Sequence, residues 1–125
     1  MNPRSSKAKG RKLQNLLRDK LREIFITKWT KLPKLEEDDI KSQTMGMTGE
    51  DIVLSPKARQ LIPYSFECKN VERLQFWATV DQAESNLKDN TNAAIVIKKN
   101  RKDPYVAITL EHFLELIGGK NARQR

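Results

Sequence analysis

The chain has 125 residues, of which 38% are hydrophobic and 32% charged, and its formal net charge is +8. This length predicts one compact domain, and no apolar run approaches the roughly 18 residues of a membrane-spanning helix. The only cysteine, Cys68, excludes an internal disulfide framework and a zinc site built from several cysteines. The basic excess favours a polyanionic partner, either nucleic acid or an acidic membrane surface.

The charge is unevenly divided along the chain. Residues 1–34 hold eleven basic and two acidic side chains, residues 35–97 hold six and eleven, and residues 98–125 hold seven and three. A protein that binds a polyanion around an acidic chemical centre needs such a division, whereas a surface that only keeps the protein soluble does not. A basic tail combined with chance is the alternative interpretation.

The N-terminal third predicts a basic arm followed by an amphipathic helix. Residues 1–10 are small and basic, which is typical of a disordered arm. From Arg11 to about Ile26, apolar residues recur every three or four positions and the opposite face is basic, so we expect a helix. Pro33 and the acidic run at 36–39 end this pattern, and an irregular loop follows.

The rest of the chain predicts a small mixed sheet with helices around it. Residues 52–54 and 64–68 are strand-like, and their connection, centred on Arg59, predicts a hairpin. The later elements we expect are a helix from Glu72 to Asn90, strands at 93–98 and 105–109, and a helix at 110–117. The order of elements predicts a single α/β domain over residues 11–119, followed by a basic tail at 120–125.

Two acidic side chains and a lysine are expected on one face of the predicted hairpin. Strand side chains alternate between faces, so Glu67 and Lys69 project together while Cys68 points the other way. In a hairpin centred on Arg59, Asp51 lies opposite Glu67. Burying these carboxylates costs desolvation energy unless a hard divalent cation with oxygen ligands binds them. Magnesium (Mg2+) is the cation we expect, and Mn2+ is expected to be able to substitute for it.

This face predicts the hydrolysis of phosphodiesters. A metal held by Asp51, Glu67 and the backbone carbonyl of Cys68 can polarise a phosphoryl oxygen and acidify a water molecule. Lys69 then orients this water or offsets negative charge in the transition state. A second metal ion is an open alternative, and so is a simple cluster of salt bridges on an exposed sheet face.

The motifs in this order resemble those of a known superfamily. The sequence GED at 49–51 and ECK at 67–69, between an N-terminal helix and a later helix, resembles the PD-(D/E)xK nucleases. Within that superfamily the chain is most similar to small Holliday junction resolvases of archaeal and phage type, on the evidence of KG at 9–10, DQ at 81–82 and the ending IVIKKNRKDPYVAITLEHFLELI. The resemblance implies a restriction-endonuclease-like core of αβββαβ type.

The resemblance also implies roles for individual residues. Asp51 and Glu67 are implied as metal ligands, Lys69 as the catalytic lysine, and Gln82 as a helix residue that faces the site. Many of these resolvases have a glutamate on the first helix where this chain has Gln14, an amide that binds metals weakly or through water. Gln14 is therefore a candidate site residue whose place in the metal shell is open.

Basic side chains from both ends of the chain are expected to bind phosphates on the two sides of the acidic site. They are Lys7, Lys9, Arg11, Lys12, Arg18, Arg22, Lys98, Lys99, Arg101 and Lys102. The sequence shows no recognition helix for reading base edges, so we expect recognition through the shape of the DNA backbone.

Together these features predict a magnesium-dependent endonuclease that prefers four-way or other branched DNA junctions, and the resemblance implies a homodimer. One alternative is a nuclease that acts on flaps, single strands or unbranched duplex. A second alternative is a DNA-binding module without catalysis. We expect an intracellular, cytoplasmic protein, in the host cytoplasm if a phage encodes it, because the chain has one cysteine and no apolar leader.

Overall fold

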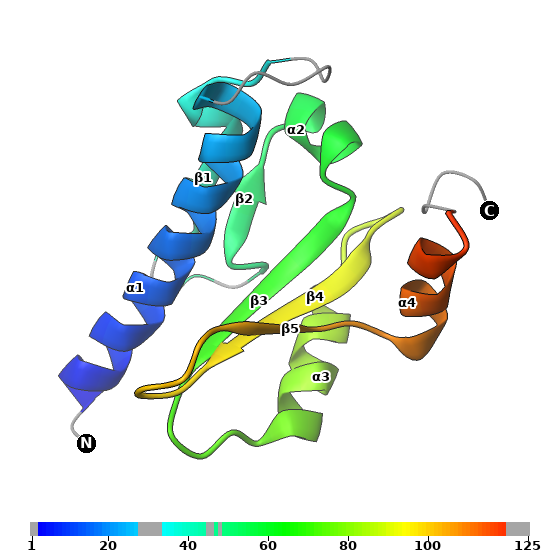
Figure 1. Ribbon diagram of the computed structural model, residues 1–125. Helices are drawn as coiled ribbons and strands as arrows, with labels where there is room; N and C mark the ends of the chain where they lie inside the picture. Colours follow the sequence, from blue (N-terminus) through cyan, green and yellow to red (C-terminus); the bar gives the residue numbers. More distant parts are fainter. Residues whose placement is uncertain (1–2, 28–33, 45–46, 48, 120–125) are drawn as a thin grey trace.

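The computed structural model describes residues 3–27, 34–44, 47 and 49–119, and the predicted tail at 120–125 lies outside them (Figure 1). The helical elements are α1 (Pro3–Arg22), η1 (Glu23–Thr27), η2 (Glu37–Asp39), α2 (Pro56–Leu61), α3 (Phe76–Ser85) and α4 (Leu110–Ile117). The strands are β1 (Ile40–Ser42), β2 (Ile52–Leu54), β3 (Tyr64–Asn70), β4 (Asn92–Lys98) and β5 (Tyr105–Ala107). None of the helices described is long and apolar enough to cross a membrane.

Two small sheets form the centre of the fold. β1 and β2 pair antiparallel, with Ile40 opposite Leu54. The second sheet has the order β3-β4-β5, in which β3 and β4 are parallel and β5 is antiparallel to β4. A backbone hydrogen bond from the Asp51 N–H to the Phe66 carbonyl, at 2.9 Å, joins the two sheets. The predicted α/β class, a restriction-endonuclease-like core with helices around small sheets, is confirmed.

The predicted hairpin about Arg59 is wrong, because the connection folds as helix α2. The Ser55 hydroxyl caps this helix by accepting a hydrogen bond from the Ala58 N–H at 3.1 Å. Pro56 occupies the first helical turn, where its missing N–H leaves no hydrogen bond unmade. The helix separates β2 from β3, so β2 pairs with β1 and β3 pairs with β4 instead.

Helix α1 begins at Pro3, eight residues before the predicted start, so the expected disordered arm is helical from Pro3 onward. Contacts with later parts of the chain hold the second turn of this basic segment, at Lys9. The Lys9 ammonium lies 3.2 Å from the Glu72 carboxylate, and the Asn70 side chain donates a hydrogen bond to the Lys9 carbonyl at 3.1 Å. Tertiary contacts therefore extend a helix that its own apolar pattern does not predict.

The sheet containing β3 has two different faces. The face toward α1 is apolar and packs against Leu13 in the hydrophobic core, and it carries Phe66, Cys68, Ala94 and Val96. The opposite face carries Glu67 and Lys69, whose neighbours on β4 are Ile95 and Ile97. Helix α3 packs on β3 and β4 from the side opposite α1 (Figure 1). The charged residues of β3 therefore lie between α3 and the sheet rather than in the main core.

Helix α4 is fixed to the start of β3 by one buried side chain. His112 is 2% exposed, and its Nε2 lies 2.5 Å from the Tyr64 hydroxyl. The Thr109 hydroxyl caps the helix by accepting a hydrogen bond from the His112 N–H at 3.0 Å. The outward face of α4 is apolar and exposed, and it consists of Leu110, Phe113, Leu114 and Ile117.

Candidate active site

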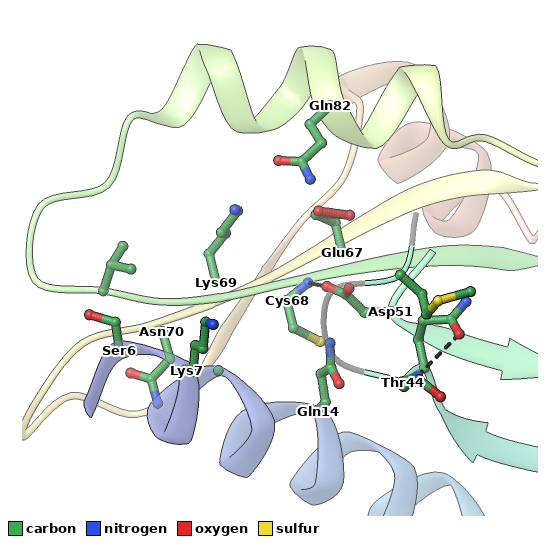
Figure 2. A pocket seen from close by; sticks show the side chains of 14 residues that line it. Ser6, Lys7, Gln14, Thr44, Asp51, Glu67, Cys68, Lys69, Asn70 and Gln82 are labelled. Carbon is green, nitrogen blue, oxygen red and sulfur yellow. Dashed lines mark hydrogen bonds between the residues drawn. The ribbon is translucent and has the colours of Figure 1, made fainter. Parts of the chain in front are cut away.

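A pocket of about 290 Å³ lies between α1, the β1–β2 loop, β3 and α3. It is lined by all five side chains that the sequence predicted as catalytic, namely Gln14, Asp51, Glu67, Lys69 and Gln82. Figure 2 shows Gln14 on the α1 side and Gln82 reaching from α3, with Glu67 and Lys69 projecting from β3 toward α3. The fold thus brings together residues that are up to 68 positions apart, from Gln14 to Gln82.

Asp51 directly precedes β2 and is held against the edge of β3. Its Oδ2 accepts a hydrogen bond from the Cys68 backbone N–H at 2.6 Å. Burial raises the pKa of Asp51, and three effects oppose it: the Cys68 N–H, the charge of Lys69 and a hydrogen bond from the Gln14 side chain. The carboxylate is therefore fixed in direction by the strand edge, and both neighbouring side chains favour its charged form.

Glu67 is buried beside Asp51 and is strongly perturbed. It is only 3% exposed, and its Oε1 has no hydrogen-bond partner in the described part of the chain. Burial, and next the charge of Asp51, raise the pKa of Glu67 to about 7, although Lys69 and Asn86 act in the opposite direction. A buried carboxylate oxygen without a partner is costly, and a bound cation removes this cost.

The donor atoms around the two carboxylates fit a hard divalent cation. In a strand, the N–H and C=O of one residue project toward the same edge. Because the Cys68 N–H points to Asp51, the Cys68 carbonyl also projects toward this edge of β3. The Gln14 Oε1 is likewise buried, with no partner among the residues that the structure describes. Carboxylate, carbonyl and amide oxygens are the ligands that Mg2+ and Mn2+ prefer.

The number of carboxylates in the site is small. Within the described ranges there is no group of three or more His, Cys, Asp or Glu side chains that could hold a metal ion. Magnesium is commonly held by one or two carboxylates, with the remaining positions filled by water and by phosphate oxygens of the substrate. Two carboxylates and one backbone carbonyl therefore fit a magnesium ion whose other ligands are water and substrate oxygens. They are too few for an ion held by protein carboxylates alone.

The remaining three site residues surround the two carboxylates. Lys69 is half-buried and projects from the same face of β3 as Glu67, two positions along the strand. Gln14 is buried on α1, at 7% exposure, whereas Gln82 is exposed on α3. The cation of Lys69 is therefore placed beside the carboxylates, and the two amides lie on either side of the pocket.

The structure adds residues to the pocket that sequence reasoning missed. They include Ser6 from α1, Gln43 and Thr44 from the loop after β1, and Asn70 at the end of β3. The Asn70 Oδ1 is buried and has no partner within the residues described. Strand alternation assigns Asn70 to the face away from Lys69, and the loop residues belong to no motif, so the sequence pattern gave no reason to include them.

Three other charged or reactive groups near the site have structural roles. Glu50 is 4% exposed and forms an ion pair with Arg59. Glu72 accepts hydrogen bonds from Lys9 and from the Asn100 N–H, the latter at 2.7 Å. Burial, and next the charges of Asp51 and Glu67, raise the pKa of the Cys68 thiol, so this group is not an activated nucleophile.

The basic residues predicted to bind DNA lie in two places, and some are engaged by the protein itself. On α1, Lys7 lines the pocket, and Arg11 and Lys12 are exposed. Arg18 forms an ion pair with Asp19 at 2.8 Å. Arg22 donates hydrogen bonds to the carbonyls of Ile40 and Glu37, so it joins α1 to β1 and its guanidinium is used within the fold.

The second basic group lies in the turn between β4 and β5. Lys99, Arg101 and Lys102 are exposed there, and Lys98 is half-buried with its ammonium 3.0 Å from the Lys99 carbonyl. Arg101 has a φ of 65°, a left-handed conformation that closes the turn. Basic side chains are therefore presented both from α1 and from this turn.

Comparison with known proteins shows the family of the chain. The family model described as "Phage putative PDDEXK endonuclease" matches residues 5–123, a range that contains every residue of the pocket. No curated protein and no solved structure matches the chain.

Proposed function

Since the chain belongs to the family of phage PDDEXK endonucleases, we propose that the pocket hydrolyses DNA phosphodiesters with a bound magnesium ion and prefers branched junctions. One observation carries this proposal. Glu67 is buried beside Asp51 and Lys69, and its Oε1 lacks a hydrogen-bond partner in the part of the chain described. Manganese, which takes similar oxygen ligands, is the expected substitute for magnesium.

Four of the five predicted side chains, together with the Cys68 carbonyl, have a role in this reaction. Asp51, Glu67 and the Cys68 carbonyl would hold the ion, which supplies a Lewis acid and lowers the pKa of a bound water when present. Lys69 places a positive charge next to the carboxylates, where it orients the attacking water and stabilises charge that develops on the phosphate. Gln14 lies beside Asp51 and acts to lower its pKa, so it favours the charged form of this ligand.

The burial of Glu67 next to Asp51 favours an enzyme over the two simpler interpretations. A cluster of surface salt bridges would have exposed carboxylates, but Glu67 is 3% exposed. A module that only binds DNA gains nothing from two carboxylates between basic surfaces, because they repel the phosphates. The burial of Glu67 and the repulsion between the carboxylates and the phosphates are both explained if the carboxylates hold a cation that acts on the phosphate.

The preference for branched DNA is supported by the resemblance to junction resolvases and by the placement of the basic residues. Exposed cations are presented by α1, at Arg11 and Lys12, and by the β4–β5 turn, at Lys99 and Lys102. Phosphate contacts from both places position DNA strands without reading bases. Flaps, single strands and unbranched duplex carry the same phosphates, so they are the alternative substrates.

The test ranks DNA substrates of one sequence under matched conditions. An end-labelled four-way junction, a flap, a single strand and a linear duplex are each incubated with the protein in magnesium, in manganese and in EDTA. We expect cleavage with either metal, none in EDTA, and the fastest cleavage for the junction. If another substrate is cut fastest, that substrate replaces the junction as the proposed target. If no substrate is cut, the proposed nuclease activity is contradicted.

We also propose that the protein forms a homodimer through the outward face of α4. The exposed side chains Leu110, Phe113, Leu114 and Ile117 recur at the spacing of one helix face, and each is at least half exposed. An apolar stripe on the outer side of a surface helix is typical of a contact with another chain. Two identical sites would then cut strands related by the symmetry of a junction.

The dimer is tested by light scattering on the purified protein. We expect twice the monomer mass of 14.5 kDa for the wild type, and the monomer mass for Leu114→Glu, because a buried charge without a partner opposes association. Leu16→Glu, at a similarly exposed apolar position on α1, is the matched control and should remain dimeric. A wild type that is monomeric at all micromolar concentrations would contradict the proposal.

A further inference from the structure

A second pocket, of about 390 Å³, adjoins the candidate active site. The two pockets share Lys69 and Val71, so the second begins where the first ends. From there it extends across the sheet to Tyr105, and Leu74 and Ile97 complete an apolar wall. A ligand bound at Lys69 is therefore beside an apolar recess formed by the same sheet.

The strand register gives the geometry of this recess. Lys69 on β3 pairs with Ile97 on β4, and Ile97 pairs with Tyr105 on β5, so the three residues form one row across the sheet. Neighbouring strands are about 4.8 Å apart, which places the Tyr105 backbone about 10 Å from that of Lys69. Tyr105 is 70% exposed, so its ring is available to a ligand.

The rim of the recess is basic. Lys98 at the end of β4, and Lys99 and Lys102 in the β4–β5 turn, line it together with the acidic residues Glu72 and Asp103. The carboxylate of Glu72 is already bound by the Lys9 ammonium and by the Asn100 N–H. An apolar recess with an aromatic ring and a rim of lysines has the features that a nucleotide requires, an apolar base beside charged phosphates.

We propose that this recess binds one unpaired nucleobase of the DNA strand whose phosphodiester lies at Lys69. The proposal rests on the proposed nuclease function and names what distinguishes its substrate. A base within a duplex is stacked between its neighbours, whereas a base at a branch point or bulge is free to leave the stack. Such a base stacks on Tyr105 while Lys98, Lys99 and Lys102 contact the adjoining phosphates.

The test compares two duplexes of one sequence, one fully paired and one with a single unpaired 2-aminopurine nucleotide. Binding is measured by fluorescence anisotropy in EDTA, so that no strand is cut, and stacking is measured by quenching of the 2-aminopurine. Tyr105→Ala is compared with Tyr105→Phe, which keeps the ring. The matched control is Val106→Ala, because Val106 is the next residue on β5, is exposed, and does not line the recess.

We expect the wild type to bind the bulged duplex more tightly and to quench its 2-aminopurine. Tyr105→Ala should weaken binding of the bulged duplex about tenfold, abolish the quenching and leave binding of the paired duplex unchanged. Tyr105→Phe and Val106→Ala should behave as the wild type. Thermal melts of each variant confirm folding, which the exposure of both side chains favours.

Three results would overturn the inference. The first is that Tyr105→Ala weakens binding of the bulged and the paired duplex equally, and the second is that it weakens binding of neither. The third is a change in oligomeric mass, which would identify Tyr105 as a contact with a second copy of the chain. Failure of the nuclease function is separate, because it appears as no cleavage in magnesium or manganese while the binding measurement in EDTA is unaffected. If the protein prefers the bulged duplex through Tyr105 but cuts no DNA, the nucleobase-binding recess would be supported and the nuclease function would be contradicted.

Discussion

Replacing Glu67 with glutamine is expected to reduce DNA cleavage by about 10³-fold or more, a loss comparable with removal of a main stabiliser of transition-state charge. Glutamine has the same size and keeps the pocket filled, but it removes the negative charge that would hold the metal. DNA binding should be unchanged or stronger, because one carboxylate fewer repels the phosphates. Single-turnover cleavage in magnesium and anisotropy in EDTA measure the two effects separately.

The matched control for this substitution is Glu111→Gln, an exposed glutamate on α4 that lies outside the pocket. It should cut and bind as the wild type does. The role of Glu67 as a metal ligand would be refuted by a folded Glu67→Gln variant that cuts at the normal rate. It would equally be refuted by a folded variant that no longer binds DNA.

Without metal, the protein is expected to lose stability as the pH rises from about 5 to about 8. The pKa of Glu67 is raised in the folded state to about 7 from its ordinary value of 4.5. The folded state therefore holds a proton that the unfolded state releases at a lower pH. This contribution is complete below pH 4.5 and is lost as the pH passes 7. A shift of this size corresponds to about 3 kcal/mol at most, or about 10 °C in melting temperature.

Thermal melts between pH 5 and pH 8 in EDTA measure this loss. Glu67→Gln should remove most of the slope, because glutamine does not titrate, whereas the exposed-site control Glu111→Gln should keep it. Adding magnesium should stabilise the wild type more at pH 8 than at pH 6, because the ion competes with the proton for Glu67. Equal pH slopes in the wild type and Glu67→Gln would show that another group is responsible.

The chemistry of β3 could be predicted from the sequence because strand geometry imposes it. Alternation places Glu67 and Lys69 on one face and Phe66 and Cys68 on the other, and the structure confirms both. Asp51 was expected close to Glu67, and it is, but the hairpin used to place it does not exist. A sheet edge brings Asp51 there instead, through its hydrogen bonds to Phe66 and Cys68.

The features that were missed depend on contacts between distant parts of the chain. The segment 56–61 is too short to show a helical period, and only its Ser-Pro start indicates the capped helix α2. The first turns of α1 are held by Glu72 and Asn70, more than 60 positions away. Nothing in the sequence of residues 1–10 indicates these distant contacts, so the sequence alone predicted a disordered arm there.

The contacts of Glu72 bear on how DNA binding should depend on salt. Its carboxylate binds Lys9 on α1 and the Asn100 N–H in the β4–β5 turn, so one exposed side chain spans the two elements that present basic residues. The gap between them is therefore held at a set width by an interaction that salt weakens. Rising ionic strength should weaken the Lys9–Glu72 ion pair as well as screen the phosphates. The affinity for DNA should therefore fall more steeply with salt concentration than the number of phosphate contacts alone requires.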